Sequence, residues 1–319
     1  MTKPVASPAS AGWPDAGPLQ RELDQLMEGW SEPGGPMTAM DRLIALTCEL
    51  SQHRTDPGLR ALVQAHPISA MVRQDPFTDW SYRRPRGYPG DATLIDFIYG
   101  HHTLQGALDA ATSVGRDVHL FTHGSEACVA VRERRRLLAH AVEAVLERVA
   151  DAEVMAVACG HLREMELVRG AQNARRIVAL DQDADSLREV RRCHGALGNV
   201  ECVQARVARL FVRPTQFGRF DLIYAAGLYD YLDSDAALRL TTALFSALKP
   251  GGRLLFGNFA RGIRDEGYMD AFMDWRLVLR DEADIEAMLA GVPATELVAG
   301  RVFRGNNRAI IYAMLEKAA

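Results

Sequence analysis

The sequence is poor in the residues that build disulfide frameworks and metal sites. Its 319 residues include only five cysteines, and no two of them stand at the short spacing that a zinc site requires. Their odd number and wide scatter are typical of a protein kept in a reducing compartment. We therefore expect a cytoplasmic protein without a metal site.

Long apolar runs and an excess of positive charge are also missing. The formal net charge is −4, which argues against a nucleic-acid-binding surface. No apolar stretch is long enough to span a bilayer, and the N-terminus lacks a hydrophobic signal core. These absences leave a small molecule as the expected substrate, with no nucleic-acid or membrane partner and with a homodimer as an open option.

The first third of the chain shows helical spacing and no strand pattern. Residues 1–18 are rich in Pro, Ala, Ser and Gly, which predicts a disordered tail. Residues 19–125 are predicted to form a helical lid domain. Its expected helices cover residues 19–30, 38–53, 59–66 and 92–99. Between them, residues 76–91 are predicted to be a loop, either functional or a rigid connection packed by its own aromatic side chains.

Residues 126–319 are predicted to form a ligand-binding α/β domain. A long helix is expected within 116–150, and its arginines most simply form a solvated face, although one of them could reach a ligand carboxylate. From residue 151 strands and helices alternate, which predicts a mostly parallel sheet with helices on both faces and a closing antiparallel hairpin. The expected strands are 154–158, 177–180, 200–204, 220–225, 253–259, 295–303 and 308–315. The expected helices are 235–248, 269–279 and 282–290.

The dinucleotide fingerprint G-x-G-x-x-G is absent from the first strand-to-helix turn. There the strand ends in Cys159-Gly160, a helix is expected from His161, and the second strand ends on Asp181. A single glycine suits a ligand that has a ribose but no diphosphate, and S-adenosylmethionine (SAM) is the commonest such ligand. The helix start could hold a carboxylate, and Asp181 could accept ribose hydroxyls. The alternative is a turn that binds nothing.

Ligands of open α/β sheets bind outside the carboxyl ends of the strands. The segments at those ends should therefore line one crevice, which the helical domain could cover. They are residues 158–160, Asp181, and residues 204–206, 226–229 and 257–259.

The order of the motifs resembles the class I SAM-dependent methyltransferases from residue 150 onward. The matching segments are CGHLRE, LDQD, FDLIYAAGLYDYL and LKPGGRLLFGNF. More narrowly, RGYPGD, AVRERR, GLYDYL, GNF and DWRLVLR resemble the extracellular-factor family of 3-hydroxypalmitate methyl ester biosynthesis proteins, over most of the chain beyond residue 75. That family commonly has Cys-Gly-Pro at the first turn, whereas Cys159-Gly160-His161 here resembles a small offshoot that closes SAM into azetidine-2-carboxylate.

The resemblance implies a Rossmann-like fold with a seven-stranded sheet and a SAM site. Gly160 is expected near the methionine moiety, Asp181 at the ribose and Gln182 at the adenine edge. The other expected cofactor contacts are Ala158, His161, Glu164, Ala205, Arg206, Ala226 and Gly227. Glu164 could equally be a carboxylate favoured by the helix macrodipole. A histidine at a helix start, such as His161, is more often a local hydrogen-bonding residue than a catalyst.

Displacement at a sulfonium releases a leaving group that needs no protonation, so alignment and desolvation can drive it. Accordingly, the sequence shows no Ser-His-Asp, Cys-His or paired-carboxylate pattern. Aromatic faces stabilise such a cation by roughly 0.5–2 kcal/mol, and Tyr229 is our first candidate. The other candidate catalytic residues are Tyr88, Asn258 and Asp91. Packing is the alternative role for the tyrosines.

Three functions remain open. The leading hypothesis, which depends on the resemblance at residues 161–164, is cyclisation of SAM to azetidine-2-carboxylate with release of methylthioadenosine. Methyl transfer to a small acceptor is the alternative, and it needs a channel that Phe272, Met273 and Trp275 could line, although the first two are more often core residues. The third is a SAM-binding regulator without turnover.

Overall fold

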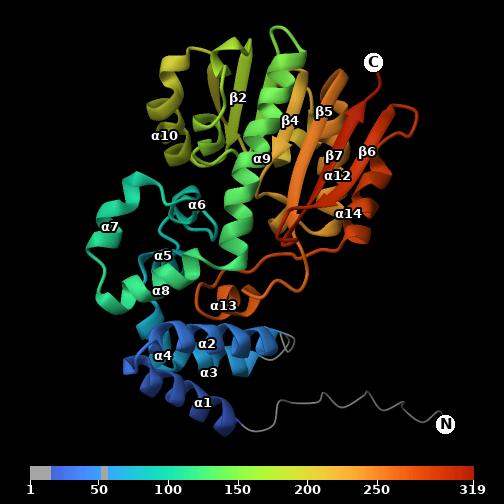
Figure 1. Cartoon of the computed structure of the whole chain (residues 1–319). Coiled ribbons are helices and arrows are strands. Elements are labelled where there is room, and N and C mark those ends of the chain that lie inside the picture. Colours follow the sequence, from blue (N-terminus) through green and yellow to red (C-terminus); the bar gives the residue numbers. More distant parts are fainter. Residues whose placement is uncertain (1–15, 52–56) are drawn as a thin grey trace, which may run out of the picture.

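The computed structural model describes residues 16–51 and 57–319 (Figure 1). Most of the predicted tail, residues 1–15, lies outside the described residues, whereas residues 16–18 already belong to the first helix. The helices up to residue 148 are α1 (Ala16–Glu28), η1 (Gly29–Ser31), α2 (Gly35–Ser51), α3 (Pro57–Ala65), α4 (Pro67–Val72), α5 (Pro76–Arg83), α6 (Ala92–Tyr99), η2 (His102–Leu104), α7 (Gln105–Asp109), α8 (Ser113–His123) and α9 (Glu126–Arg148).

The N-terminal helices form because their apolar residues recur at helical spacing. Leu19, Leu23 and Leu26 of α1 are buried, as are Met40 and Leu43 of α2, so each helix buries one face. These residues belong to the same continuous apolar core as one face of the sheet. Helix α9 is the long helix that links this helical region to the sheet in Figure 1.

The segment predicted to be a loop begins with a helix. The Asp75 carboxylate accepts the N–H groups of Phe77 and Thr78, and Pro76 opens α5. A capping aspartate followed by proline is a helix start as well as a turn signal. Only residues 84–91 remain irregular, between α5 and α6.

The sheet has seven strands in the order β3-β2-β1-β4-β5-β7-β6. Strands β1 to β5 are parallel, and β7 runs antiparallel to both β5 and β6. The predicted architecture, including the closing hairpin, is confirmed. The strands are β1 (Glu153–Val157), β2 (Arg176–Asp181), β3 (Val200–Gln204), β4 (Phe220–Ala225), β5 (Leu248–Phe259), β6 (Leu297–Arg304) and β7 (Ile310–Lys317).

Helices cover both faces of this sheet. Buried residues of α9 and α10 join the core on one face, whereas those of α11, α12 and α14 join the core on the other. The remaining helices are η3 (Arg163–Glu166), η4 (Ala171–Asn173), α10 (Ala184–His194), η5 (Gly195–Leu197), α11 (Ala208–Val212), η6 (Tyr229–Tyr231), α12 (Ser234–Ser246), α13 (Glu266–Ala271), α14 (Glu282–Met288) and η7 (Leu289–Gly291). Within the described ranges, no helix is long and apolar enough to cross a membrane.

Two predicted helices are wrong in part. The helix expected from His161 is only the single 3-10 turn η3, because Ala158, Gly160 and Leu162 all have positive φ and alternate with other residues. Such a backbone cannot continue a right-handed helix. The helix expected at 269–279 ends at Ala271. The chain after it runs back to the sheet, where the Arg280 N–H donates to the carbonyl of Phe259.

Candidate active site

A partly enclosed cavity of about 560 Å³ lies at the carboxyl ends of β1, β2 and β4, beneath α6 and the 84–91 loop. This volume is within the range of about 300–1,000 Å³ that is usual for small-molecule sites. Most of the predicted site residues line it. They are Tyr88, Ala158, Gly160, His161, Glu164, Asp181, Gln182, Arg206, Ala226 and Gly227. Ala205 instead lines an adjoining open groove.

Asp181 and the glycine turn hold each other in place. The Gly160 N–H donates to Oδ2 of Asp181 at 2.8 Å, and the Asp183 N–H donates to Oδ1 at 2.9 Å. Burial raises the pKa of Asp181, while these N–H groups oppose the shift. A carboxylate offers about four lone-pair sites, so the buried Asp181 keeps acceptor capacity for hydroxyl groups in the cavity.

Gly160 is required for two separate reasons. Its φ is +55°, and a Cβ atom there would lie 3.2 Å from Cβ of Ala92 in α6. A side chain would therefore strain the backbone and press against α6. The glycine therefore allows a close contact between the turn and α6.

Glu164 is buried beside the cavity. Its Oε1 accepts the Tyr224 hydroxyl at 2.6 Å, and burial raises the pKa of the carboxyl group. The macrodipole explanation for this residue fails because no α-helix follows β1. Glu164 therefore presents a buried carboxylate to the ligand space.

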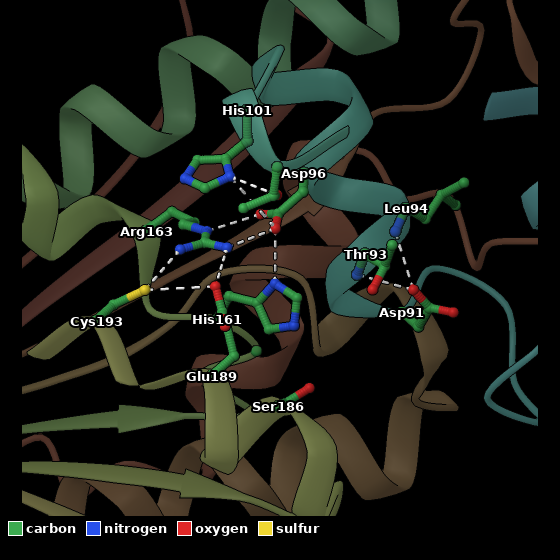
Figure 2. A network of polar contacts seen from close by, with 12 residues as sticks. Asp91, Thr93, Leu94, Asp96, His101, His161, Arg163, Ser186, Glu189 and Cys193 are labelled. Atoms are coloured by element: carbon green, nitrogen blue, oxygen red, sulfur yellow. Dashed lines mark hydrogen bonds and ion pairs between the residues drawn. The ribbon is translucent and has the colours of Figure 1, made fainter. Parts of the chain in front are cut away.

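His161 is a structural link between the turn after β1 and helix α6 (Figure 2). Its Nδ1 lies 2.8 Å from Oδ2 of Asp96 on α6, and its Nε2 lies 3.2 Å from a guanidinium nitrogen of Arg86. Arg163 donates to both carboxylate oxygens of Asp96, at 2.9 and 2.7 Å, and to Glu189 on α10 at 2.7 Å. These contacts give His161 the local hydrogen-bonding role that we expected for it.

The 84–91 loop closes one side of the cavity. Arg86 donates to Asp183 at 2.7 Å and to Ser186 at 2.9 Å, and the Tyr88 hydroxyl donates to Asp183 at 3.2 Å. These bonds tie the loop to the start of α10. Tyr88 and Gly90 line the cavity, so the loop is both a connection and part of the site.

Arg134 corrects the prediction of a solvated arginine face. Its side chain is only 4% exposed and lines the cavity, near Gly227. Its Nε and Nη1 have no hydrogen-bond partner among the described residues. An unpaired buried cation is costly unless an anion joins it. Ala130 and Leu138 lie four residues to either side and are buried, so the helical period already placed Arg134 on the core face of α9.

Asp230 was also missed by the sequence reasoning. It is 2% exposed and lines the cavity next to Tyr231. Its Oδ1 accepts the Phe259 N–H at 2.7 Å. Burial raises the pKa of its carboxyl group to about 6, against the lowering effect of Arg134 and the Phe259 N–H.

Tyr229 does not reach the ligand space, so its predicted contact with a sulfonium is wrong. Its ring is fully buried and stacks on Phe256 with centroids 4.0 Å apart. Its hydroxyl lies 3.0 Å from Oγ1 of Thr241 on α12. The residue packs the second core, because η6 turns Tyr229 toward α12 and leaves Asp230 on the cavity side.

Tyr229→Phe should leave the affinity for S-adenosylhomocysteine unchanged within about twofold. It should lower the free energy of unfolding by about 0.5–1.5 kcal/mol, because one buried hydrogen bond is lost. Calorimetric titration and urea unfolding measure the two effects. A marked loss of affinity at unchanged stability would restore Tyr229 to the site.

Asn258 and Asp91 have structural roles in place of the predicted catalytic ones. The Asn258 amide donates to the carbonyls of Phe259 and Val278, and its oxygen accepts from Arg280 at 2.6 Å. Asp91 caps α6 through the N–H groups of Thr93 and Leu94 and also accepts the Trp80 indole N–H. Neither Asn258 nor Asp91 lines the cavity.

Residues 154–252 match the family model described as "Methyltransferase domain". The structure agrees with that match. It has five parallel strands extended by an antiparallel hairpin, with the cavity at the strand tips. The chain has the class I methyltransferase fold. The match implies SAM as the cosubstrate of this methyltransferase-fold enzyme.

Two curated relatives match about a quarter of this chain. The ubiquinone/menaquinone biosynthesis C-methyltransferase UbiE of Pasteurella multocida (strain Pm70) is 43% identical over 79 residues, which are 24% of this chain and 27% of that protein. The protein of the same name from Proteus mirabilis (strain HI4320) is 42% identical over 79 residues, 24% of this chain and 29% of its own length. The chain thus spans less than a third of the length of these relatives.

A solved structure extends the likeness beyond that domain. It is described as a "possible exported protein" from Bordetella parapertussis and aligns with a TM-score of 0.56 and 18% identity, over 78% of this chain and 95% of that chain. At this identity the likeness concerns the methyltransferase fold alone.

The residues of the cavity fit SAM. Asp181 suits the ribose hydroxyls, and Gln182 and Arg206, which we expect to contact the adenine, line the same cavity. The guanidinium of Arg134, whose Nε and Nη1 find no partner in the described part of the chain, suits a carboxylate. Glu164 and Asp230 are buried carboxyl groups suited to an ammonium. The cavity therefore offers groups for both the adenosyl and the amino-acid ends of this ligand.

Proposed function

We propose that this protein binds SAM and closes its aminobutyrate arm into azetidine-2-carboxylate, with release of methylthioadenosine. The observation that carries the proposal is the set of charges in one cavity: an unpartnered buried arginine, Arg134, with the buried carboxyl groups of Glu164 and Asp230. They are complementary to the two charges of an α-amino acid. The substrate in this proposal is a small molecule, and no second substrate is needed.

When bound, SAM supplies an electrophilic carbon next to a sulfonium and a neutral thioether leaving group. The chain then has to hold the arm bent and exclude water. Arg134 would fix the carboxylate, which keeps that group from attacking the same carbon. Tyr88 and its loop, held by Asp183, would shield the cavity from solvent.

The predicted acceptor channel gives no support to a second substrate. Phe272 and Met273 are buried in the core and do not line the cavity. Only Trp275 of the three reaches it, and its indole N–H donates to the Tyr231 hydroxyl at 2.7 Å. Two of the three side chains expected to line a channel therefore pack the interior.

We expect the purified protein to convert SAM, with no other substrate, into equal amounts of methylthioadenosine and azetidine-2-carboxylate. Liquid chromatography with mass spectrometry measures both products, against a protein-free control for spontaneous breakdown. Methylthioadenosine with homoserine lactone would mean that the carboxylate attacks in place of the amine. No product despite tight binding would leave the regulatory hypothesis.

Methyl transfer is the second candidate, because residues 154–252 match the methyltransferase domain family. Both relatives are named as C-methyltransferases of ubiquinone and menaquinone biosynthesis. This candidate predicts S-adenosylhomocysteine, formed only when an acceptor is added. The same assay therefore separates the two reactions.

A further inference from the structure

Asp230 is held rigidly at the wall of the cavity. Its carboxylate Oδ1 accepts the Phe259 N–H at 2.7 Å, and its own carbonyl accepts the Val278 N–H at 2.8 Å. Two segments distant in sequence thus fix both its backbone and its side chain. For Oδ2, no hydrogen bond is found within the described part of the chain, and the residue borders the ligand space.

The neighbouring charges leave this carboxylate without a committed partner. Arg280 donates to the carbonyls of Tyr229 and Leu232 and to Asn258, so its guanidinium is occupied. Arg134 approaches from α9 and makes no salt bridge with Asp230. The other titratable groups facing Asp230 are Tyr231 on its own turn and Tyr312 on β7.

We propose that Asp230 is the base that takes a proton from the α-ammonium group of the bound substrate. The inference rests on the proposed cyclisation. One N–H bond breaks, and an O–H bond forms on Oδ2. The freed nitrogen pair then forms the N–Cγ bond while the Cγ–S pair leaves with sulfur, which becomes a neutral thioether. The proton passes from Asp230 to water when the products leave.

The acidity of Asp230 suits this role. Burial raises its pKa to about 6. This value is closer than the pKa of an ordinary aspartate to the pKa of about 7.7–8.0 that is usual for an α-amino group. A general base works best when it is ionised at the working pH and its pKa is near that of the proton donor. Glu164 is less suited, because its carboxyl group accepts two hydrogen bonds, from the Tyr224 hydroxyl at 2.6 Å and from its own backbone N–H, whereas Asp230 accepts one.

Asp230→Asn tests the role with little change of shape, because an asparagine oxygen can still accept the Phe259 N–H. We expect the rate of azetidine formation to fall by about 100-fold or more. The affinity for S-adenosylhomocysteine, which has the amino-acid end, should fall by about tenfold. The affinity for methylthioadenosine, which lacks that end, should stay the same. The residual rate of the variant should rise with pH without the lower inflection near pH 6 of the wild type.

Asp221→Asn is the matched control. Asp221 is also a buried aspartate that accepts a backbone N–H, that of Glu153, but it contacts Lys249 away from the cavity. It should retain the rate and both affinities. If the wild type makes azetidine-2-carboxylate and Asp230→Asn makes it at a rate within threefold of the wild-type rate, this inference alone is overturned. A wild-type protein that makes no azetidine would overturn the proposed function, and this inference with it.

Discussion

Replacing Arg134 with methionine should weaken the binding of S-adenosylhomocysteine by about 10- to 150-fold and leave methylthioadenosine binding unchanged. A hydrogen bond to a charged group contributes about 1.5–3 kcal/mol, and about 1.4 kcal/mol corresponds to a factor of ten. The selectivity arises because only the first ligand carries a carboxylate. Calorimetric titration of both ligands measures it.

The same substitution should make the ligand-free protein more stable. The Arg134 guanidinium is buried, and its Nε and Nη1 lack partners among the residues described, so methionine removes a desolvated charge with unsatisfied donor groups. Arg136→Met is the matched control, because Arg136 is an exposed arginine on the same helix. It should change neither property. Equal losses for the two ligands would show that Arg134 supports the fold and not the ligand carboxylate.

Replacing Asp96 with alanine should lower the free energy of unfolding by about 3–5 kcal/mol, the usual loss when one partner of a buried ion pair is removed. Asp96 is 2% exposed and bonds to both Arg163 and His161, as Figure 2 shows. Without it, the Arg163 guanidinium stays buried with less compensation, and α6 loses its polar attachment to the turn after β1. Urea unfolding measures the change.

Two further measurements separate this network from a general surface effect. Asp185→Asn removes an exposed ion pair with Arg188 and should lower the free energy of unfolding by at most about 1 kcal/mol.

Burial would raise the pKa of Asp96, but the hydrogen bonds from His161 and Arg163 lower it below its usual value of 3.8. Its stabilising contribution is therefore present above the ordinary pKa of 3.8 and is lost as the pH falls through that value and then through the lower pKa of the folded state. The difference between wild type and Asp96→Ala should shrink in that acidic range. A constant difference would contradict the role of the ion pair.

Much of the fold could be predicted because its signals are local. Apolar runs such as Val154–Val157 within β1 have no polar face, which is typical of a buried parallel strand. The predicted ends of β1 and β2 placed the lone glycine, Gly160, and the acid, Asp181, at the same edge of the sheet. In the structure a hydrogen bond joins these two residues. The helix expected at His161 failed because positive φ values at 158, 160 and 162 depend on the packing of the turn against α6.

The sequence by itself determined the succession of strands along the chain and the edge of the sheet that holds the cavity, and most of the site residues predicted from it line that cavity. Only the tertiary structure decided which side chains near that edge enter the cavity. Tyr229 and Asp230 are neighbours, yet the first packs beneath α12 and the second faces the ligand space. Arg134 comes from a helix far from the strand tips in sequence. The physical reason is that strand periodicity places backbone segments, whereas the direction of a side chain in a short turn or across a helix interface depends on the groups that pack against it from elsewhere.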